Sequence, residues 1–318
     1  MNLPLSVVHD AQEFLRKCLP RTRLVEAPSL SRRTGANVFL KLESELPTGS
    51  FKPRGALYTL HVNSQERRIR GVVASSTGNH GAAVAFAARQ LGVPAFVFLP
   101  QNPNPVKRAK IEALGAKIFE SGHDLGDAFD AAAAYARAED MYLLNDATDP
   151  DLPFGPATIA CEILEEMPDA DAIYAPMGDT ALIRGISGAA KQISQKIAIV
   201  GVQAERAPSY YLSWKSGRAT TTPTCDTIAD GLATRTPHAE NVRAIKEVVD
   251  DVKLVTEDQM LTAVRNLLLD EHLVVEPSGA ATTAAVLRDG ASAGGKIVLI
   301  VSGANIAPDV LRRALAES

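Results

Sequence analysis

The feature that most constrains the fold is a regular alternation of short apolar runs with segments of helical apolar spacing, which begins at Gly71. The runs GVVAS, AFVFLP and AKIFES alternate with such segments, and the pattern resumes with AIYAPMG and KIAIVGVQA. Strands that alternate with helices favour parallel sheets covered by helices on both faces. We therefore predict an α/β protein of two α/β units, with the Pro-rich stretch 150–156 as the crossing between them.

Composition excludes several classes of function. The chain has 318 residues, of which 46% are hydrophobic, so two domains with sizeable cores are expected. Its 33 basic and 37 acidic residues give a net charge of −4 and are interspersed, which argues against a nucleic-acid or anionic-membrane partner. No apolar stretch is long enough to span a bilayer, and the first residues do not resemble a secretory signal. Three widely spaced cysteines fit ordinary thiols in a reducing compartment, so we predict a cytoplasmic protein.

The run PTGSFKPRGAL places Lys52 between a turn and a helix that begins near Pro53. A cation at a helix N-terminus is electrostatically misplaced, because the helix dipole favours cations at the other end. Such a placement suits an amine that must be neutral and nucleophilic, or held as an imine. The alternative from this motif alone is an ordinary surface lysine.

The run SSTGNHG, residues 75–81, joins an apolar run to an Ala-rich helical segment. Backbone N–H groups at a helix start, together with Ser76, Thr77 and Asn79, form a pocket suited to a carboxylate or phosphate. A simple helix cap would need only one such residue. We therefore favour an anion site over a cap.

Two further loops follow apolar runs. In APMGDTALIRG, residues 175–185, the loop could hold a phosphate at a helix N-terminus, although Asp179 adds an unfavourable negative charge. VSGANI, residues 301–306, is by itself a common strand end followed by a turn. Because ligands of doubly wound folds bind at the carboxyl ends of strands, the loops after Ser75, Ala175 and Val301 are candidates for one site.

In this order the four motifs resemble the serine/threonine dehydratase branch of the fold-type II pyridoxal-phosphate enzymes, which includes threonine deaminase, serine dehydratase and serine racemase. The resemblance extends over essentially the whole chain and also includes TIADGLATRTP, VDDVKLVTEDQM and VVEPSGAA. It implies two three-layer α/β/α domains with pyridoxal 5'-phosphate in the cleft between them. It places the small domain at residues 70–146 and the large, cofactor-binding domain at 1–69 and 147–318.

The resemblance also implies roles for individual residues. Lys52 would hold the cofactor as a Schiff base, and Ser302 would meet its pyridine nitrogen. Because a serine hydroxyl is too weak a partner to keep that nitrogen charged, β-elimination of a hydroxyl competes well. Lys52, once displaced by the substrate amine, would remove the α-proton. The remaining implied cofactor contacts are Phe51, Asn79, Gly178, Asp179, Thr180 and Ala181, and the implied substrate contacts are Ser76, Thr77, Gly78 and His80.

The chain departs from the family pattern at three places. The phosphate loop, usually a run of glycines, contains Asp179 here, so this side chain must point away or meet a cation. Racemases of the family use a serine hydroxyl where this chain has Thr77, which makes Thr77 a second candidate catalytic residue. Several relatives bind a divalent cation near the position of Glu205, but Tyr211 replaces the expected Asp. We predict that no metal binds there.

The predicted function is a pyridoxal-phosphate-dependent ammonia-lyase, or dehydratase, which converts a β-hydroxy amino acid to a 2-oxo acid and ammonia. L-Threonine or L-serine is the default substrate, and a homodimer is expected. The alternatives are an amino-acid racemase and a threonine-synthase-like or β-replacement enzyme. A non-catalytic α/β binding module is a further alternative, and it predicts no imine at Lys52.

Overall fold

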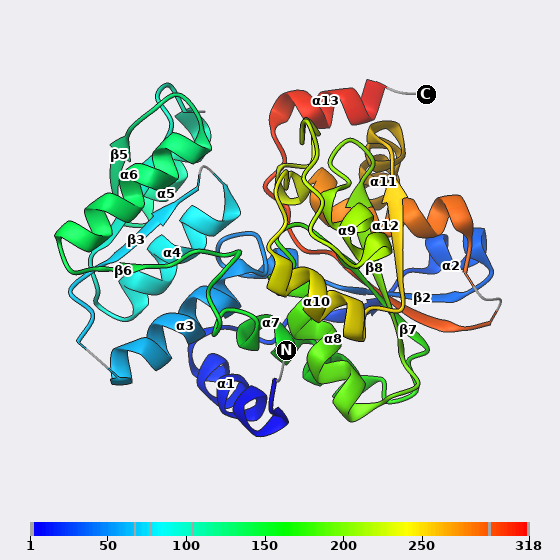
Figure 1. The fold of residues 1–318 in the computed structure, drawn as a ribbon. Helices are drawn as coiled ribbons and strands as arrows, with labels where there is room; N and C mark the ends of the chain where they lie inside the picture. The colour runs from blue at the N-terminus through cyan, green and yellow to red at the C-terminus, as the bar shows by residue number, and fades with distance from the viewer. Residues whose placement is uncertain (1–2, 67, 77, 104, 292–293, 317–318) are drawn as a thin grey trace.

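The computed structural model describes residues 3–66, 68–76, 78–103, 105–291 and 294–316. These residues form two sheets, each with helices on both faces, and the two units lie side by side (Figure 1). The α/β class and the fold-type II layering predicted from the sequence are confirmed. None of the described helices is long and apolar enough to cross a membrane.

The larger sheet has six strands in the order β1-β2-β10-β7-β8-β9. Every neighbouring pair is parallel except β1 and β2, which are antiparallel. Its inner strands are mostly apolar, as in the run Val298 to Ile300, because both faces of the sheet are buried. The strands are β1 (Leu24–Glu26), β2 (Asn37–Lys41), β7 (Ala172–Pro176), β8 (Ala198–Ala204), β9 (Asp251–Val255) and β10 (Lys296–Ile300).

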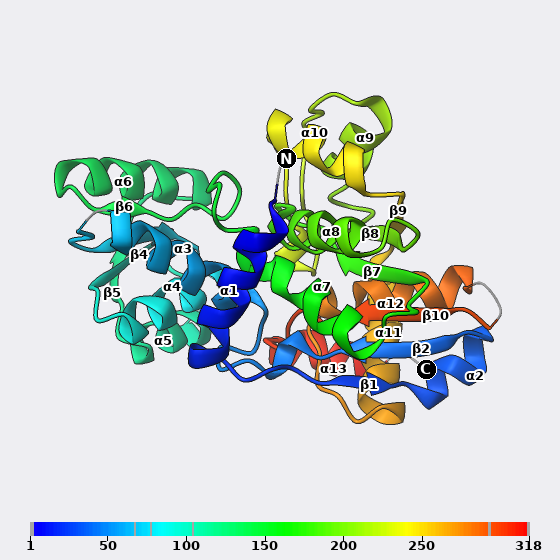
Figure 2. The same ribbon diagram turned by 90° about the horizontal axis from the view of Figure 1, so that it is seen from below.

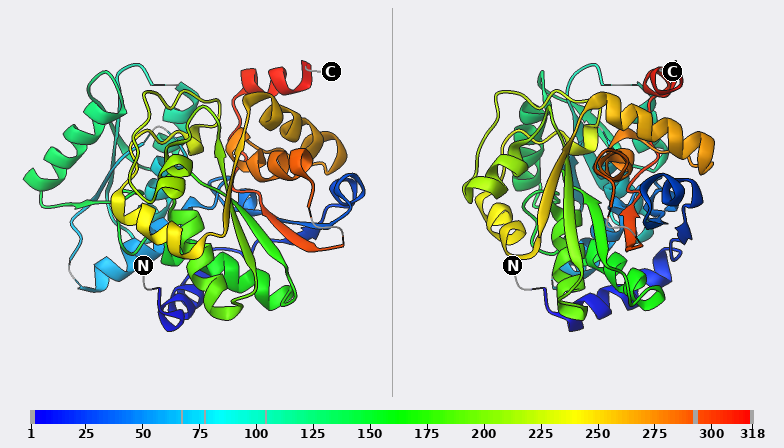
Figure 3. Two further views of the ribbon diagram at one scale, coloured as in Figure 1. Left: turned by 45° about the vertical axis from the view of Figure 1, so that its right-hand side comes forward. Right: turned by 90° about the vertical axis from the view of Figure 1, so that its right-hand side faces the viewer.

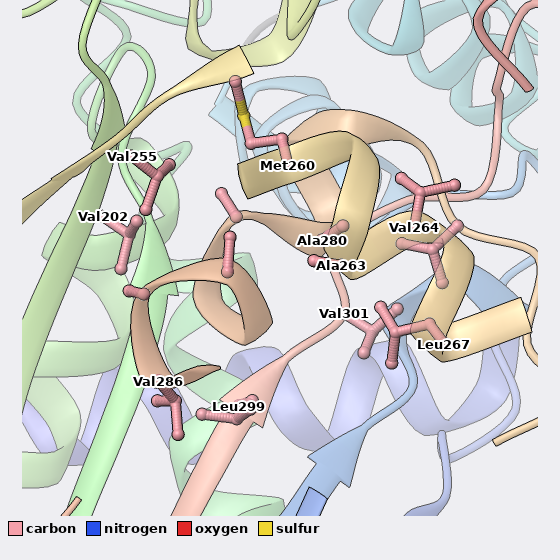
Figure 4. Close-up of a cluster of buried hydrophobic side chains, with 14 of the residues drawn as sticks. Val202, Val255, Met260, Ala263, Val264, Leu267, Ala280, Val286, Leu299 and Val301 are labelled. Atoms are coloured by element: carbon pink, nitrogen blue, oxygen red, sulfur yellow. The ribbon is translucent and has the colours of Figure 1, made fainter. Parts of the chain in front are cut away.

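Two hydrophobic cores cover the two faces of this sheet. Figure 4 shows part of one core, where Val202, Val255 and Leu299 of the sheet face Met260 and Val286 of the helices. The other core lies under α7, α8 and α10. The helices of this unit are α2 (Pro28–Thr34), α7 (Phe154–Glu166), α8 (Ala181–Ile193), α9 (Ser209–Ser216), η2 (Asp230–Leu232), α10 (Ala239–Val248), α11 (Glu257–Asp270), α12 (Pro277–Asp289) and α13 (Pro308–Ala316).

The smaller sheet has four parallel strands in the order β5-β4-β3-β6. An apolar core that includes residues of α3 and α4 lies on one face, and an aromatic cluster beneath α6 lies on the other. The strands are β3 (Val72–Ser75), β4 (Ala95–Leu99), β5 (Lys117–Glu120) and β6 (Tyr142–Leu143). The helices before and within this unit are α1 (Leu5–Cys18), η1 (Glu43–Glu45), α3 (Lys52–Glu66), α4 (Asn79–Gln90), α5 (Pro105–Ala113) and α6 (Leu125–Ala138).

Helices α1 and α3 connect the two units, because both contact α7 (Figure 2). The first and last helices, α1 in dark blue and α13 in red, lie at opposite ends of the larger unit (Figure 3). Leu57 and Leu60 of α3 belong to the core of the smaller unit, although α3 precedes the predicted boundary at residue 70. The predicted domain limits therefore stay a prediction.

The alternation from Gly71 onward predicts most elements of both sheets. The segment 205–236, where the alternation is interrupted, contains the short helix α9 and the turn η2. The alternation of apolar runs with helical segments does not predict three of the strands, which are β1, β2 and the edge strand β9. They are short, and their partners in the sheet come from distant parts of the chain.

Candidate active site

A cavity of about 590 Å³ lies between the two units, where the strands β3, β7 and β10 end. This volume falls within the range of small-molecule sites. The predicted site residues that line it are Phe51, Lys52, Ser76, Gly78, Asn79, His80, Gly178, Asp179, Thr180, Ala181 and Ser302. Thr77 lies outside the described residues, so its predicted role stays a prediction, as does the absence of a metal near Glu205.

Lys52 is the first residue of α3, and its side chain is 17% exposed. The backbone N–H of Phe51 donates to the Ser302 carbonyl at 3.0 Å, which ties the turn before α3 to the end of β10. The ammonium of Lys52 donates to Asp146 Oδ2 at 2.7 Å. Burial lowers the pKa of Lys52, but the charges of Asp146 and Asp179 outweigh it, so the net shift is upward.

The side-chain amide of Asn79 is held in one orientation from two sides. Its Nδ2 donates to Glu276 Oε1 at 2.7 Å, and its Oδ1 accepts a hydrogen bond from Asn305 Nδ2 at 2.6 Å. Lys110 of α5 donates to the Thr48 carbonyl at 2.9 Å and also to the Asn305 side chain, so the smaller unit contacts the larger across the cavity. An amide fixed in this way presents a defined donor edge to a ligand.

The loop before α8 is shaped like an anion site. Thr180 has a positive φ of 74° at the N-cap of α8, whose first N–H groups have no partner within the helix. A Cβ added to Gly178 would lie 2.1 Å from the Gly231 carbonyl oxygen, so only glycine fits this close approach.

Asp179 repels an anion bound in this loop less strongly than a fully charged carboxylate would. Its Oδ1 accepts a hydrogen bond from Thr234 Oγ1 at 3.1 Å. Burial, followed by the charge of Asp146, raises the pKa of Asp179 to about 6. A carboxyl group with such a pKa is partly neutral near pH 6, which reduces its repulsion of a bound phosphate.

His80 is buried, and its ring is fixed by a hydrogen bond of 3.0 Å between Nε2 and the Leu144 carbonyl oxygen. Because a carbonyl oxygen only accepts, Nε2 carries the proton and Nδ1 is the unprotonated nitrogen of the neutral ring. Nδ1 lies 3.9 Å from Asp146 Oδ2. Burial lowers the pKa of His80, which favours the neutral ring. Its predicted contact with a substrate carboxylate stays a prediction.

Sequence reasoning missed several residues that line the cavity. Asp146 follows the run MYLLN, and the rule that places ligands at the carboxyl ends of strands applies to this position too. Glu276 and Asn305 lie within the motifs VVEPSGAA and VSGANI, but their functional contacts depend on strands and helices distant in sequence. Lys110 carries no sequence signal that we can identify, whereas the segment 230–234 lies within the motif TIADGLATRTP, for which no role was predicted.

Comparison with known proteins identifies the family. The model of the family described as pyridoxal-phosphate dependent enzyme matches residues 15–303. The chain belongs to this family. It is 34% identical over 313 residues to the L-threonine ammonia-lyase of Thermotoga maritima, covering 98% of this chain and 78% of that protein. It is 35% identical over 305 residues to the L-threonine ammonia-lyase of Geobacter sulfurreducens, covering 96% and 76% respectively.

Comparison with solved structures supports the same family. The structure of maize serine racemase superimposes with a TM-score of 0.93 at 29% sequence identity, covering 99% of this chain and 97% of that one. These likenesses support the predicted dehydratase branch of fold-type II enzymes, and pyridoxal 5'-phosphate is the cofactor of this pyridoxal-phosphate enzyme.

The residues of the cavity fit this cofactor. Pyridoxal phosphate needs an amine for its aldehyde and a donor-rich site for its phosphate. Lys52 supplies an amine that faces the cavity, and the start of α8 supplies backbone donors. The crowded position of Gly178 and the raised pKa of Asp179 both suit a phosphate that approaches the backbone closely.

Proposed function

We propose that this pyridoxal-phosphate enzyme is an ammonia-lyase that converts a β-hydroxy amino acid to a 2-oxo acid and ammonia. The observation that carries the proposal is the amine of Lys52, which lines the same cavity as the start of α8. Two L-threonine ammonia-lyases match nearly the whole chain, which makes L-threonine or L-serine the first substrates to test.

In this proposal Lys52 would hold the cofactor through its Nζ, with Phe51 beside the ring. The loop of residues 178–181 would hold the phosphate, Asn79 the ring hydroxyl and Ser302 the pyridine nitrogen. When bound, the cofactor supplies an electron sink for the bond between Cα and its hydrogen.

The substrate would be oriented at the other wall of the cavity. Backbone and side-chain groups at residues 76–78 and His80 would bind its carboxylate, which places the α-hydrogen toward Lys52. Lys52 Nζ, free once the substrate amine has replaced it, would then accept the α-proton. The β-hydroxyl takes up one proton and leaves as water, so the net loss is the α-hydrogen and the hydroxyl, and the released enamine adds water to give the 2-oxo acid and ammonia.

Racemisation is the second candidate, and the likeness to maize serine racemase favours it. It requires an acid on the side of the substrate opposite Lys52, for which Thr77 is the proposed residue. A β-replacement reaction differs from both because it needs an added nucleophile or a phosphorylated substrate.

The proposal also includes a homodimer and a location in the cytoplasm, which is a reducing compartment. It further includes a small domain at residues 70–146 and a large domain at 1–69 and 147–318. The free thiols of Cys18, Cys161 and Cys225 are compatible with such a compartment. Light scattering after gel filtration tests the dimer, because it gives the mass of the assembly directly.

The deciding experiment supplies purified, cofactor-loaded protein with a panel of β-hydroxy amino acids and measures 2-oxo acid and ammonia in parallel. Equal release of both products from one amino acid would establish the lyase and identify its substrate. Faster loss of optical activity than formation of 2-oxo acid would favour the racemase. No product from any amino acid would contradict both functions.

A further inference from the structure

Asp146 is a carboxylate in the cavity to which the proposed reaction assigns no role. It lies three residues after the end of β6, on the smaller unit, and faces the start of α3. Its Oδ2 is 2.7 Å from Lys52 Nζ and 3.9 Å from His80 Nδ1. A carboxylate this close to a reacting amine controls whether that amine carries a proton.

We propose that Asp146 is a positioning residue that holds the proton of Lys52 and accepts it when Lys52 must act as a free amine. This inference rests on the proposed function only in taking Lys52 as the reacting amine. The step is a single proton transfer: an N–H bond at Nζ breaks, an O–H bond at Asp146 Oδ2 forms, and the electron pair stays on Nζ. The ion pair thereby becomes a neutral amine beside a neutral carboxyl group.

Without substrate the charged state dominates: burial raises the pKa of Asp146, but the neighbouring charges and the hydrogen bond from Lys52 outweigh it, so the net shift is downward. An ion pair hydrogen-bonded at 2.7 Å stabilises the charged state, whereas exclusion of water favours the neutral one. Closure of the cavity by a bound substrate removes more water and shifts the balance toward the neutral pair. A free amine on Lys52 is then available to accept the α-proton.

The other charged groups that face Lys52 cannot replace Asp146. Asp179 lies on the loop after β7, and its Oδ1 is engaged with Thr234. Glu276 precedes α12, and its Oε1 accepts a hydrogen bond from Asn79. Both raise the pKa of Lys52 through their charge, but Asp146 accepts the hydrogen bond that Lys52 Nζ donates.

His80, on α4, is the group next to this pair. Its Nε2 is committed to the Leu144 carbonyl oxygen, so Nδ1 is the nitrogen with a lone pair, and it faces Asp146. Because the 3.9 Å between Nδ1 and Asp146 Oδ2 exceeds a hydrogen-bond distance, the neutral ring lies beside the carboxylate without taking its proton.

The test measures the protonation of Lys52 without cofactor or substrate. Cofactor-free protein is treated with short pulses of an amine-acylating reagent over a range of pH, and the labelled fraction of Lys52 is measured by mass spectrometry. Lys191, which pairs with Asp250 outside the cavity, is the internal reference in the same sample. The variants are Asp146→Asn, Asp146→Glu and, as a matched control, Asp151→Asn, whose carboxylate contacts Asn63 instead.

In Asp146→Asn we expect the pH of half-labelling of Lys52 to fall by about one to three units, because the uncompensated buried amine loses its proton more easily. Asp146→Glu should restore most of the wild-type value, and Asp151→Asn should leave it unchanged. Equal half-labelling pH values in Asp146→Asn and the wild type would overturn the proposal. An equal shift in Asp151→Asn would overturn it too, since the effect would then come from altered folding of the loop.

The cofactor-loaded enzyme gives a second readout. Asp146→Asn should lower kcat with little change in KM, and should move the acidic limb of the kcat profile to lower pH. Unchanged kcat and an unmoved limb would contradict the proposal. Because the labelling needs no turnover, the role of Asp146 and the lyase function are tested separately. A shifted half-labelling pH without 2-oxo acid formation supports the role of Asp146 and rejects the lyase. An unshifted half-labelling pH with 2-oxo acid formation supports the lyase and rejects the role of Asp146.

Discussion

Arg54 Nη1 donates to Glu162 Oε1 at 2.7 Å where α3 lies against α7, and both side chains are almost fully excluded from water. The guanidinium of Arg54 also binds Glu43, and Lys41 contacts the second oxygen of Glu162 at 2.6 Å. This buried network holds the first turn of α3, in which Arg54 follows Lys52 by two residues. The position of the Lys52 amine therefore depends on charges that lie outside the cavity.

Removal of one partner from this network should destabilise the fold strongly. Glu162→Ala leaves Lys41 as a buried cation without a carboxylate and Arg54 with Glu43 alone, and breaking such a buried pair costs about 3–5 kcal/mol in comparable sites. Urea unfolding measures the loss. The control is Glu166→Ala on the same helix, where the exposed pair with Arg21 should contribute only about 0–1 kcal/mol. Equal losses in both variants would show that the buried network does not stabilise α3.

The same carboxylate predicts a dependence of stability on pH. Burial raises the pKa of Glu162, but the charges and hydrogen bonds of Arg54 and Lys41 outweigh it, so the folded-state pKa lies below the ordinary value of 4.5. The stability from this pair is therefore complete above that value and is lost as the pH falls through the folded-state pKa. Unfolding midpoints of the wild type and Glu162→Gln should converge in acid. A gap that stays constant with pH would contradict this assignment.

Replacement of the proposed cofactor lysine should abolish turnover and leave the fold intact. Lys52→Ala removes both the amine that would hold the cofactor and the base for the α-proton. Formation of 2-oxo acid, circular dichroism and borohydride reduction of the imine are the measurements. Lys191→Ala, outside the cavity, should behave like the wild type in all three. Steady-state elimination by Lys52→Ala would reject the mechanism.

Ser302→Asp tests the proposed partner of the pyridine nitrogen. Ser302 lines the cavity at the end of β10 and is only 5% exposed. A carboxylate at this position would keep the nitrogen protonated and deepen the electron sink, so a long-wavelength absorbance should accumulate during turnover and elimination should slow. Stopped-flow spectra measure both. An unchanged spectrum and rate would mean that Ser302 does not face the pyridine ring.

Gly178→Ala should weaken cofactor binding. A methyl group at this position would lie 2.1 Å from the Gly231 carbonyl oxygen, so the loop before α8 or the η2 turn must move. Because the phosphate would be held by backbone donors of that loop, we expect a loss of at least about tenfold in affinity, which corresponds to roughly 1.4 kcal/mol. Titration of the cofactor-free protein by fluorescence gives the dissociation constant. Wild-type affinity would place the phosphate elsewhere.

The sequence by itself determines the class of fold and most of the cavity wall. Apolar runs at 71–75, 95–100 and 196–204 are long enough for strands buried on both faces, and helical spacing separates them. Polar and glycine-rich loops follow these runs, and parallel strands bring their carboxyl ends to one edge. For this reason Asn79 and Ser302 could be predicted to share a site, whereas the family resemblance placed Lys52 with them; in the structure all three line one cavity.

Only the tertiary structure decides how these residues are paired. Asp146 resembles any acidic residue after a short strand, and its proximity to Lys52 depends on how the smaller unit is placed against α3. Likewise, Asn305 and Glu276 fix the amide of Asn79 from segments about two hundred residues away. Local patterns specify strands and helices, whereas hydrogen bonds and pKa shifts at the site depend on distances of a few ångströms between separate elements, which no local pattern encodes.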